Sequence, residues 1–267
     1  MKEPLDLVLV DKRFVESRIK AQWLVRNGHV LVDGQTIIEP GTRINSKSNI
    51  TVLREYPYVG RGGIKLEKAI KEFSVEVKDK TCADIGASIG GFTDCLLKHG
   101  AKKVYSIDTA TDLLHPSLLC EKNEGRVMPL LGIDARNLKS LEEKIDLCTI
   151  DVSFTSLREL LPNVKQFLKS SGDIIALVKP LFELKEPPDQ QYNFIDDPKT
   201  LSRILNDLKA WAENMGLIPQ GLIRSPLEGK GGSTEFFFHF RLEGKKEGID
   251  MKKVLENLFE TEAHFDG

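Results

Sequence analysis

The chain has 267 residues, of which 40% are hydrophobic and 29% charged, and its formal net charge is −2. This composition fits one or two globular domains and excludes binding of nucleic acid through an overall positive charge, so such binding needs a local basic patch. The chain has no signal-peptide core, no apolar run near the roughly 18 residues of a membrane span and no C-x-x-C pair, so we expect a cytoplasmic protein with buried, reduced thiols, no membrane attachment and no metal site.

Residues 1–55 form the first predicted unit, a small α+β domain. A helix is expected over residues 17–28, with a serine N-cap and a glycine at its end. Residues 29–38 predict a β-hairpin with an Asp-Gly turn, and residues 49–53 predict one more strand. The apolar residues expected on one face of the helix are Ile19, Trp23 and Leu24.

Basic residues gather on this helix and just before it, with Glu16 as the only acid among them. The cluster predicts a surface that contacts RNA phosphates, and charge alone also fits an ordinary solvated helix face. The expected RNA contacts in this unit are Arg13, Arg18, Lys20 and Arg26.

The spacing of these residues resembles a known module. The run Ser17-Arg18-x-Lys20-Ala21, followed by Gly28-x-Val30-x-Val32-Asp33-Gly34, is similar to the S-four domain, a small RNA-binding module. The resemblance implies that the helix carrying the Ser-Arg pair and the turn after it face structured RNA. Pro4 stands where the family usually has an arginine.

Prolines and glycines over residues 56–63 predict a linker, and Arg61 within it is a further expected RNA contact. Residues 64–245 then alternate between strand and helix patterns, which predicts an α/β domain with a doubly wound, mostly parallel, Rossmann-like sheet. Residues 181–197 are expected to be a loop, and residues 246–267 a C-terminal tail or helix. The expected strands are 82–85, 103–108, 127–131, 147–151, 173–179 and 235–240, and the expected helices are 91–98, 157–168 and 198–215.

The first of these strands leads into a glycine-rich turn, A-D-I-G-A-S-I-G-G-F at residues 83–92, and Asp108 ends the next strand. This arrangement predicts a site for a nucleotide-like cofactor; the alternative is a tight turn with no ligand. An acid before the first glycine would repel the pyrophosphate of a dinucleotide and suits an amino-acid ammonium group. We therefore expect S-adenosylmethionine, with Asp84 near its methionine end and Asp108 on its ribose. The other expected contacts in the turn are Gly86, Ser88, Gly90, Gly91 and Phe92.

Ionisable residues at the ends of separate predicted helices and strands indicate which chemical group the site could methylate. Asp151 is followed by Val-Ser-Phe, without the prolines typical of enzymes that methylate base amines, and Cys148 is expected inside its strand as core and not as a nucleophile. A ribose hydroxyl needs a base and nearby charge, which lysines and carboxylates could supply. The four residues are Lys65, Asp151, Lys179 and Glu235; the alternative for them is ordinary salt bridges at strand ends.

Motifs across nearly the whole chain resemble the TlyA (hemolysin A) family, in which an S-four domain is fused to a methyltransferase of the FtsJ/RrmJ type. The runs lie at 61–69, 84–94, 150–154, 178–183 and 235–236, and read R-G-G-I-K-L-E-K-A, D-I-G-A-S-I-G-G-F-T-D, I-D-V-S-F, V-K-P-L-F-E and E-F. The resemblance implies S-adenosylmethionine-dependent 2′-O-methylation of ribosomal RNA within ribosomal subunits. It implies Lys179 as general base, Asp151 as the residue that orients it and also contacts the cofactor, and Lys65 and Glu235 as residues that position the ribose.

The chain departs from the family near the expected cofactor. The family has Gly-Tyr-Gly-Gln-Leu where residues 110–114 read A-T-D-L-L, and an Asn-x-Arg near the adenine where this chain has Asp134-Ala135-Arg136. The resemblance implies that Asp134 and Ala135 contact the cofactor; the alternative for Asp134 is an acid that caps a loop. Leu181 replaces a glutamine, and residues 190–195 replace a glycine-rich loop. Because of these departures, the alternative remains that the chain is a catalytically inactive RNA- or ribosome-binding protein with the same fold. The family name alone suggests a hemolysin. The sequence does not predict the target nucleotide or the oligomeric state.

Overall fold

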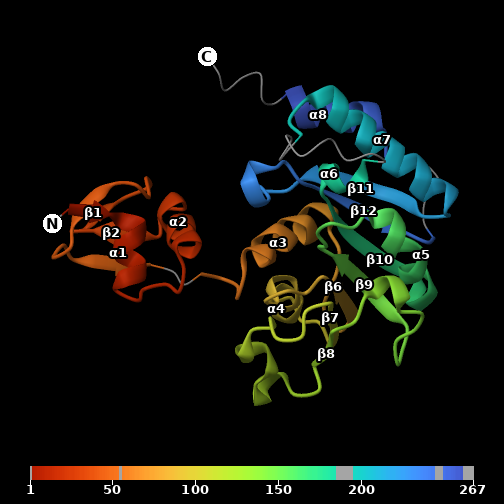
Figure 1. The fold of residues 1–267 in the computed structure, drawn as a ribbon, viewed down its shortest axis with the longest axis horizontal. Coiled ribbons are helices and arrows are strands. Elements are labelled where there is room, and N and C mark those ends of the chain that lie inside the picture. The colour runs from red at the N-terminus through yellow and green to blue at the C-terminus, as the bar shows by residue number, and fades with distance from the viewer. Residues whose placement is uncertain (1, 54–55, 185–194, 244–248, 261–267) are drawn as a thin grey trace. The chain divides into compact units, whose positions relative to one another are not determined.

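The computed structural model describes residues 2–53, 56–184, 195–243 and 249–260. They form two compact units, Met1–Arg61 and Gly62–Gly267 (Figure 1). Each unit has a hydrophobic core of its own.

The first unit packs helices α1 (Leu5–Asp11) and α2 (Arg18–Arg26) against short strands. Its elements are β1 (Lys2–Pro4) paired with β4 (Arg43–Asn45), and a sheet in the order β3 (Gln35–Thr36), β2 (Val30–Val32), β5 (Ile50–Val52).

The sequence predicted the helix and the hairpin of this unit correctly. Ser17 caps α2 by accepting the backbone N–H of Lys20, and Asp33 and Gly34 have φ angles of 51° and 82°, as a type I′ turn requires. The predicted apolar face was wrong at one position. Ile19 is 47% exposed, and the residues of α2 that pack into the core are Ala21, Leu24 and Val25.

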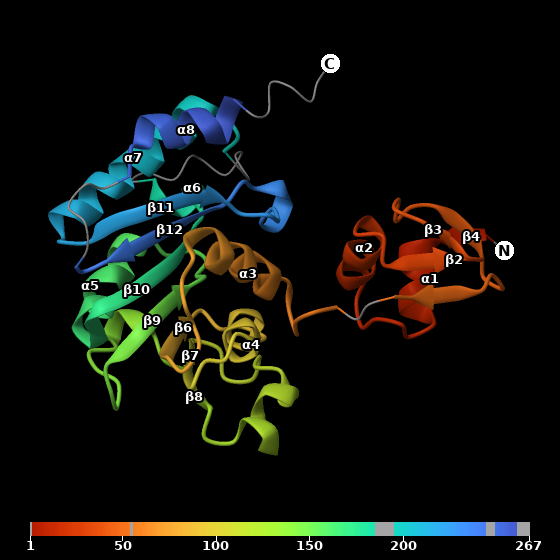
Figure 2. The same cartoon turned by 180° about the vertical axis from the view of Figure 1, so that it is seen from behind.

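The second unit is built on a seven-stranded sheet in the order β11-β12-β10-β9-β6-β7-β8. The five strands from β10 to β8 are parallel, and β12 is antiparallel to both β10 and β11. Helices α3 and α4 lie on one side of the sheet and α5 and α7 on the other (Figures 1 and 2). The expected Rossmann-like sheet is therefore confirmed. The strands are β6 (Thr81–Ile85), β7 (Lys103–Asp108), β8 (Val127–Leu131), β9 (Ile145–Ile150), β10 (Leu168–Val178), β11 (Ile218–Arg224) and β12 (Phe236–Arg241).

The helices of this unit are α3 (Arg61–Phe73), α4 (Gly91–Lys98), α5 (Leu157–Phe167), α6 (Pro180–Glu183), α7 (Pro198–Asn214) and α8 (Met251–Glu260). Two of them differ from expectation. α3 begins inside the segment expected to be a linker, and α6 forms the start of the segment expected to be a loop. Residues 185–194 of that expected loop lie outside the described residues, as do residues 246–248 and 261–267 of the expected tail and residues 244–245 before it. β11 was not predicted.

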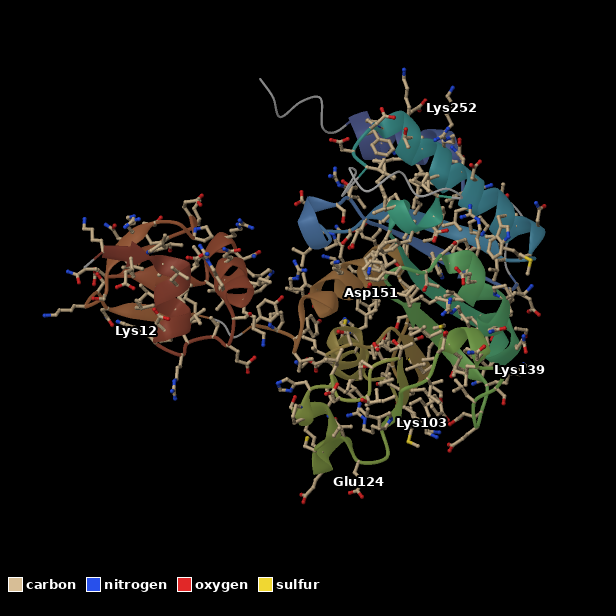
Figure 3. All side chains as sticks on the ribbon, in the orientation of Figure 1. Lys12, Lys103, Glu124, Lys139, Asp151 and Lys252 are labelled. Atoms are coloured by element: carbon tan, nitrogen blue, oxygen red, sulfur yellow. The ribbon has the colours of Figure 1, made fainter. Side chains whose placement is uncertain are left out.

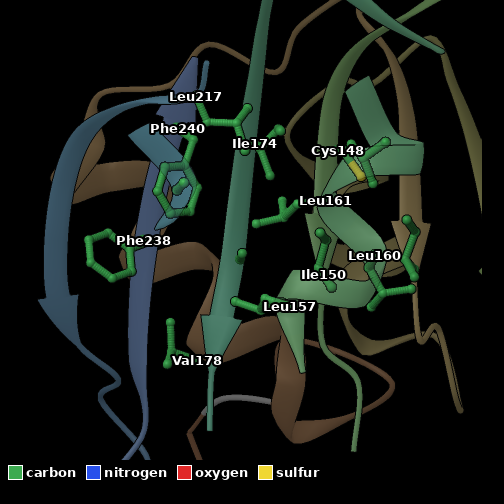
Figure 4. Close-up of a cluster of buried hydrophobic side chains, with 14 of the residues drawn as sticks. Cys148, Ile150, Leu157, Leu160, Leu161, Ile174, Val178, Leu217, Phe238 and Phe240 are labelled. Carbon is green, nitrogen blue, oxygen red and sulfur yellow. The ribbon is translucent and has the colours of Figure 1, made fainter. Parts of the chain in front are cut away.

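Apolar side chains from β9, β10 and β12 meet those of α5 in the main core (Figure 4). Cys148 belongs to this core and is completely buried, as predicted. All four cysteines lie in the described residues and none is in a disulfide bond. The expectation of buried thiols fails for Cys120, which is exposed.

Candidate active site

The carboxyl ends of β6, β7 and β9 surround a cavity of about 340 Å³, here called the β6 cavity. Because parallel strands present their carboxyl ends at one edge, ligands of open α/β sheets bind there. Six of the residues predicted to contact a cofactor line this cavity: Gly86, Ser88, Asp108, Asp134, Ala135 and Asp151.

The glycine turn gives this cavity its shape. Gly86 has a φ of 82°, and a Cβ at this position would overlap the carbonyl oxygen of Asp151. Only glycine allows the β6 turn to approach the end of β9 so closely. Ser88 also adopts a left-handed conformation, with a φ of 50°, and its backbone N–H donates to Asp108 Oδ2 at 2.7 Å.

Asp108 is held in place by the backbone. Its Oδ1 accepts the N–H of Ala110 at 2.8 Å, in addition to the bond from Ser88. The side chain is half-buried and lies on the cavity wall. A carboxylate fixed in this way keeps lone pairs for the hydroxyl groups of a ligand, because each oxygen accepts more than one hydrogen bond.

Four residues predicted to contact the cofactor lie elsewhere. Asp84 is completely buried and accepts hydrogen bonds from Thr93 Oγ1 at 2.7 Å and Thr149 Oγ1 at 3.2 Å. Burial raises the pKa of Asp84 to about 7, although these hydrogen bonds oppose the shift. Gly90, Gly91 and Phe92 are also buried under the turn. These four residues shape the turn from beneath and do not line the β6 cavity.

Asp134 faces the cavity, but its carboxylate is already engaged. It accepts the backbone N–H of Arg136 at 2.9 Å and pairs with the guanidinium of the same residue at 2.7 Å. The bond from Arg136 holds the pKa of Asp134 below its ordinary value. The apolar wall beside it was not predicted, although all but one of its residues lie at or after the end of a strand. The wall residues are Ile107, Leu113, Ile133, Val152 and, from α5, Leu160.

A second cavity of about 290 Å³, here called the β10 cavity, lies at the end of β10. Lys179 and Glu235 line it, together with Phe182. Ser153 and Phe154 line both cavities. The two cavities therefore meet at the loop that follows β9, and Figure 3 shows Asp151 of this loop near the middle of the second unit.

The four predicted catalytic residues form two ion pairs. Lys179 Nζ lies 2.7 Å from Asp151 Oδ1 and donates to Ser153 Oγ at 2.9 Å. Lys65, from α3, donates to Glu235 Oε2, and both side chains of this second pair are less than 10% exposed. Lys65 does not itself line either cavity. Buried charges are stable only when paired, so Lys65 fixes the carboxylate of Glu235, whereas the Lys179–Asp151 pair is partly exposed, at 17% and 24%.

Phe154 was part of the D-V-S-F motif but was not predicted as a site residue. Its side chain is 89% exposed and its φ is 63°, which is unusual for a bulky residue. Its ring lies 5.1 Å from that of Phe182. A strained, exposed aromatic residue beside two cavities is a stronger functional signal than the motif alone.

The basic residues of the first unit do not all share one face. Arg18 and Arg26 lie about 80° apart around the axis of α2, whereas Lys20 lies about 160° from Arg18. Arg18 is 56% exposed and donates through Nε to the buried Asp6 at 2.7 Å. Lys20 pairs instead with Glu16 at 2.6 Å.

Arg13 and Lys20 line a separate cavity of about 820 Å³ in this unit. Arg61 is exposed at the start of α3. In the described part of the chain, no group of His, Cys, Asp and Glu is arranged to hold a metal ion, and no helix has both the length and the apolar character needed to cross a membrane.

Comparison with known proteins identifies two family models in the chain. Residues 58–242 match the FtsJ-like methyltransferase model and residues 3–50 match the S4 domain model. Bacillus subtilis YqxC, whose assignment as an rRNA methyltransferase is itself provisional, is 36% identical and covers 98% of this chain and 94% of its own. The 16S/23S rRNA (cytidine-2′-O)-methyltransferase TlyA of Mycobacterium tuberculosis is 33% identical over 90% of each chain. A solved hemolysin-type structure from Streptococcus thermophilus is 31% identical, with a TM-score of 0.70 over 98% of this chain and 97% of its own.

Proposed function

This chain belongs to the TlyA/hemolysin A family, whose members join an S4 domain to an FtsJ-like methyltransferase domain, and we propose that it methylates the 2′-hydroxyl of a cytidine in ribosomal RNA. The methyl donor of this family is S-adenosylmethionine, and its S4 domain binds RNA. The observation that carries the proposal is the Lys179–Asp151 pair, which lies where the β6 and β10 cavities meet.

The residues of the β6 cavity fit S-adenosylmethionine. Asp108 presents a fixed carboxylate suited to ribose hydroxyls, and the wall around Ile133 and Leu113 is apolar, as a purine ring requires. Asp134 and Ala135 would border the adenine. When bound, the cofactor supplies an electrophilic methyl group.

We assign the β10 cavity to the target nucleotide. A ribose hydroxyl is a weak acid, so a base must take its proton as it attacks. Lys179 is the group placed to do so in its neutral amine form, becoming an ammonium paired with Asp151, because Asp151 and Ser153 hold its Nζ at the junction of the two cavities. The buried Lys65–Glu235 pair fixes the carboxylate of Glu235 in the cavity wall, where it positions the ribose.

The proposed substrate is rRNA in a ribosomal subunit in the cytoplasm, since the M. tuberculosis relative acts on 16S and 23S rRNA. The first unit supplies exposed arginines for RNA phosphates. Arg18 is oriented by Asp6 through Nε, so the two terminal nitrogens of its guanidinium are available for a bidentate phosphate contact.

Two measurements test the proposal. Calorimetry with S-adenosylmethionine separates an enzyme from an inactive binding protein, and we expect micromolar affinity. Incubation of purified 30S or 50S subunits with tritiated S-adenosylmethionine should then place label on rRNA. Absence of binding and of transfer to either subunit would contradict the proposal.

A further inference from the structure

Glu183 is a buried carboxylate four positions after Lys179. It is the last residue of α6, and its side chain is 2% exposed. Its Oε1 accepts the backbone N–H of Leu157 at 2.7 Å, and its Oε2 accepts Ser156 Oγ at 2.7 Å. Arg158 donates to the same Oε2 at 2.7 Å. Glu183 therefore binds the first turn of α5, where a negative charge is favoured by the free N–H groups and the helix dipole.

These bonds connect the two segments that carry the proposed catalytic pair. α5 follows the loop of residues 151–155, which bears Asp151 and Ser153, and α6 follows Lys179. The two segments are joined at one end by Lys179 with Asp151 and Ser153. At the other end they are joined by Glu183. The rings of Phe154 and Phe182 meet between the two connections.

The loop needs such a second connection because it is strained. Phe154 has a φ of 63° and a side chain that is 89% exposed, so its own burial does little to offset the cost of that conformation. A strained conformation persists only when bonds on either side of it enforce it. Lys179 supplies bonds on one side and Glu183 on the other.

The geometry points to Glu183 as the positioning residue that holds Asp151 and Ser153 within reach of Lys179. This role rests on the proposed function of Lys179. Glu183 does not line either cavity and so acts through the loop and not on the substrate. Burial raises the pKa of Glu183 above its ordinary value, and the paired guanidinium of Arg158 opposes that shift, so the pairing strengthens the connection.

The test compares Glu183→Ala and Glu183→Gln in the full chain. Since a misplacement of about 1 Å can cost about 100-fold in rate, we expect Glu183→Ala to lower kcat for rRNA methylation by about that factor. The affinity for S-adenosylmethionine and the KM for rRNA should stay at the wild-type values. Glu183→Gln should recover part of kcat, because its amide oxygen can still accept the Leu157 N–H.

The control is Asp250→Ala. Asp250 also accepts the first N–H groups of a helix, those of Lys252 and Lys253 in α8, but it is exposed and has no bond to the loop of residues 151–155. Asp250→Ala should lower the thermal midpoint and leave kcat unchanged. A wild-type kcat in Glu183→Ala would overturn the inference, as would an equal loss of kcat in Asp250→Ala.

A crystal structure of Glu183→Ala separates this inference from the proposed function. We expect Asp151 Oδ1 to lie beyond hydrogen-bonding distance of Lys179 Nζ in that variant. If the two atoms stay 2.7 Å apart as in the wild type, the inference fails even if the wild type methylates rRNA. If the wild type transfers no methyl group, the proposed function fails, and the distance still decides the role of Glu183.

Discussion

The same two strands, β9 and β10, carry a lysine–aspartate pair at each end. At their amino ends Lys169 lies 2.7 Å from Asp146, and just beyond their carboxyl ends Lys179 lies 2.7 Å from Asp151. The first pair is on the surface, with Lys169 44% exposed, and lines none of the cavities described above. The second pair also binds Ser153 and borders both cavities of the sheet. An ion pair at a strand end therefore indicates a site only when loops build a cavity around it.

The largest expected effect separates these two pairs. Lys179→Ala should lower the rate of rRNA methylation at least about 1,000-fold, because it removes the proposed general base. Lys169→Ala removes the same functional group from the opposite end of β10 and should leave the rate unchanged. Initial rates of methyl transfer from tritiated S-adenosylmethionine measure both. Equal methylation rates for the two variants would contradict the assignment of Lys179, and not Lys169, to the active site.

Asp173, near the amino ends of β9 and β10, stabilises the fold and takes no part in the proposed reaction. It is almost completely buried and bonded to His239 at 2.8 Å, Arg241 at 2.6 Å and Lys80 at 3.2 Å. Asp173→Ala should lower the free energy of unfolding by about 3 kcal/mol, because it leaves the buried His239 without its partner. Methylation by the folded protein should be unaffected. Urea unfolding and initial rates measure the two quantities, and a lost rate in fully folded Asp173→Ala would contradict the assignment.

The pH dependence of the unfolding free energy also tests the stabilising role of Asp173. Burial alone would raise the pKa of Asp173, but the bonds from His239 and Arg241 hold it well below the ordinary value. A carboxyl with a lowered pKa in the folded state stabilises above its unfolded pKa of about 3.9, and this contribution is lost as pH falls further. Wild-type stability should therefore fall below about pH 4, and Asp173→Ala should show less of that fall.

Two glycines provide the next comparison. Gly86, after β6, and Gly125, before β8, both have left-handed conformations, with φ angles of 82° and 72°. Alanine at either costs about 1–2 kcal/mol of conformational energy. Only at Gly86 would the added Cβ overlap the backbone of Asp151, whereas nothing lies within 4 Å at Gly125. We expect Gly86→Ala to lower kcat/KM by about 100-fold and Gly125→Ala to leave it unchanged.

Much of this carboxyl end was predictable because strand ends and glycine turns have local patterns. Asp108, Asp151, Lys179 and Glu235 all lie at the ends of strands, where the sequence predicted them. Their partners were not predictable, since the pairing of Lys65 with Glu235 joins residues 170 positions apart. Asp84 was expected near the cofactor, but its carboxylate is buried and bonded to Thr93 of α4 and Thr149 of β9. These partners are distant in the sequence and come together only in the assembled sheet.

The role of Gly62 was also not predictable from the sequence. A glycine pair at residues 62–63 indicated a linker, yet α3 begins at Arg61. A Cβ at Gly62 would lie 3.0 Å from the ring of Phe92, so this glycine allows close packing of a helix on α4. Glycine required for packing and glycine required for flexibility look alike in a sequence.

The smallest expected effect concerns the first unit, where the charges are exposed. Arg18→Ala should weaken rRNA binding by about tenfold and reduce the salt dependence by about one phosphate contact. Arg18→Lys keeps the charge but loses the Nε bond to Asp6, so it should restore the salt dependence and only part of the affinity. Binding titrations at several salt concentrations test this. An unchanged slope in Arg18→Ala would exclude a phosphate contact.

The most direct test of the account is the identity of the methylated nucleoside. Ribosomal RNA incubated with S-adenosylmethionine and the wild type, Lys179→Ala or Lys169→Ala is digested to nucleosides and analysed by mass spectrometry. We predict 2′-O-methylcytidine with the wild type and with Lys169→Ala, and none with Lys179→Ala. A methyl group on a base, or 2′-O-methylcytidine formed equally by Lys179→Ala, would contradict the assignment of the β10 cavity.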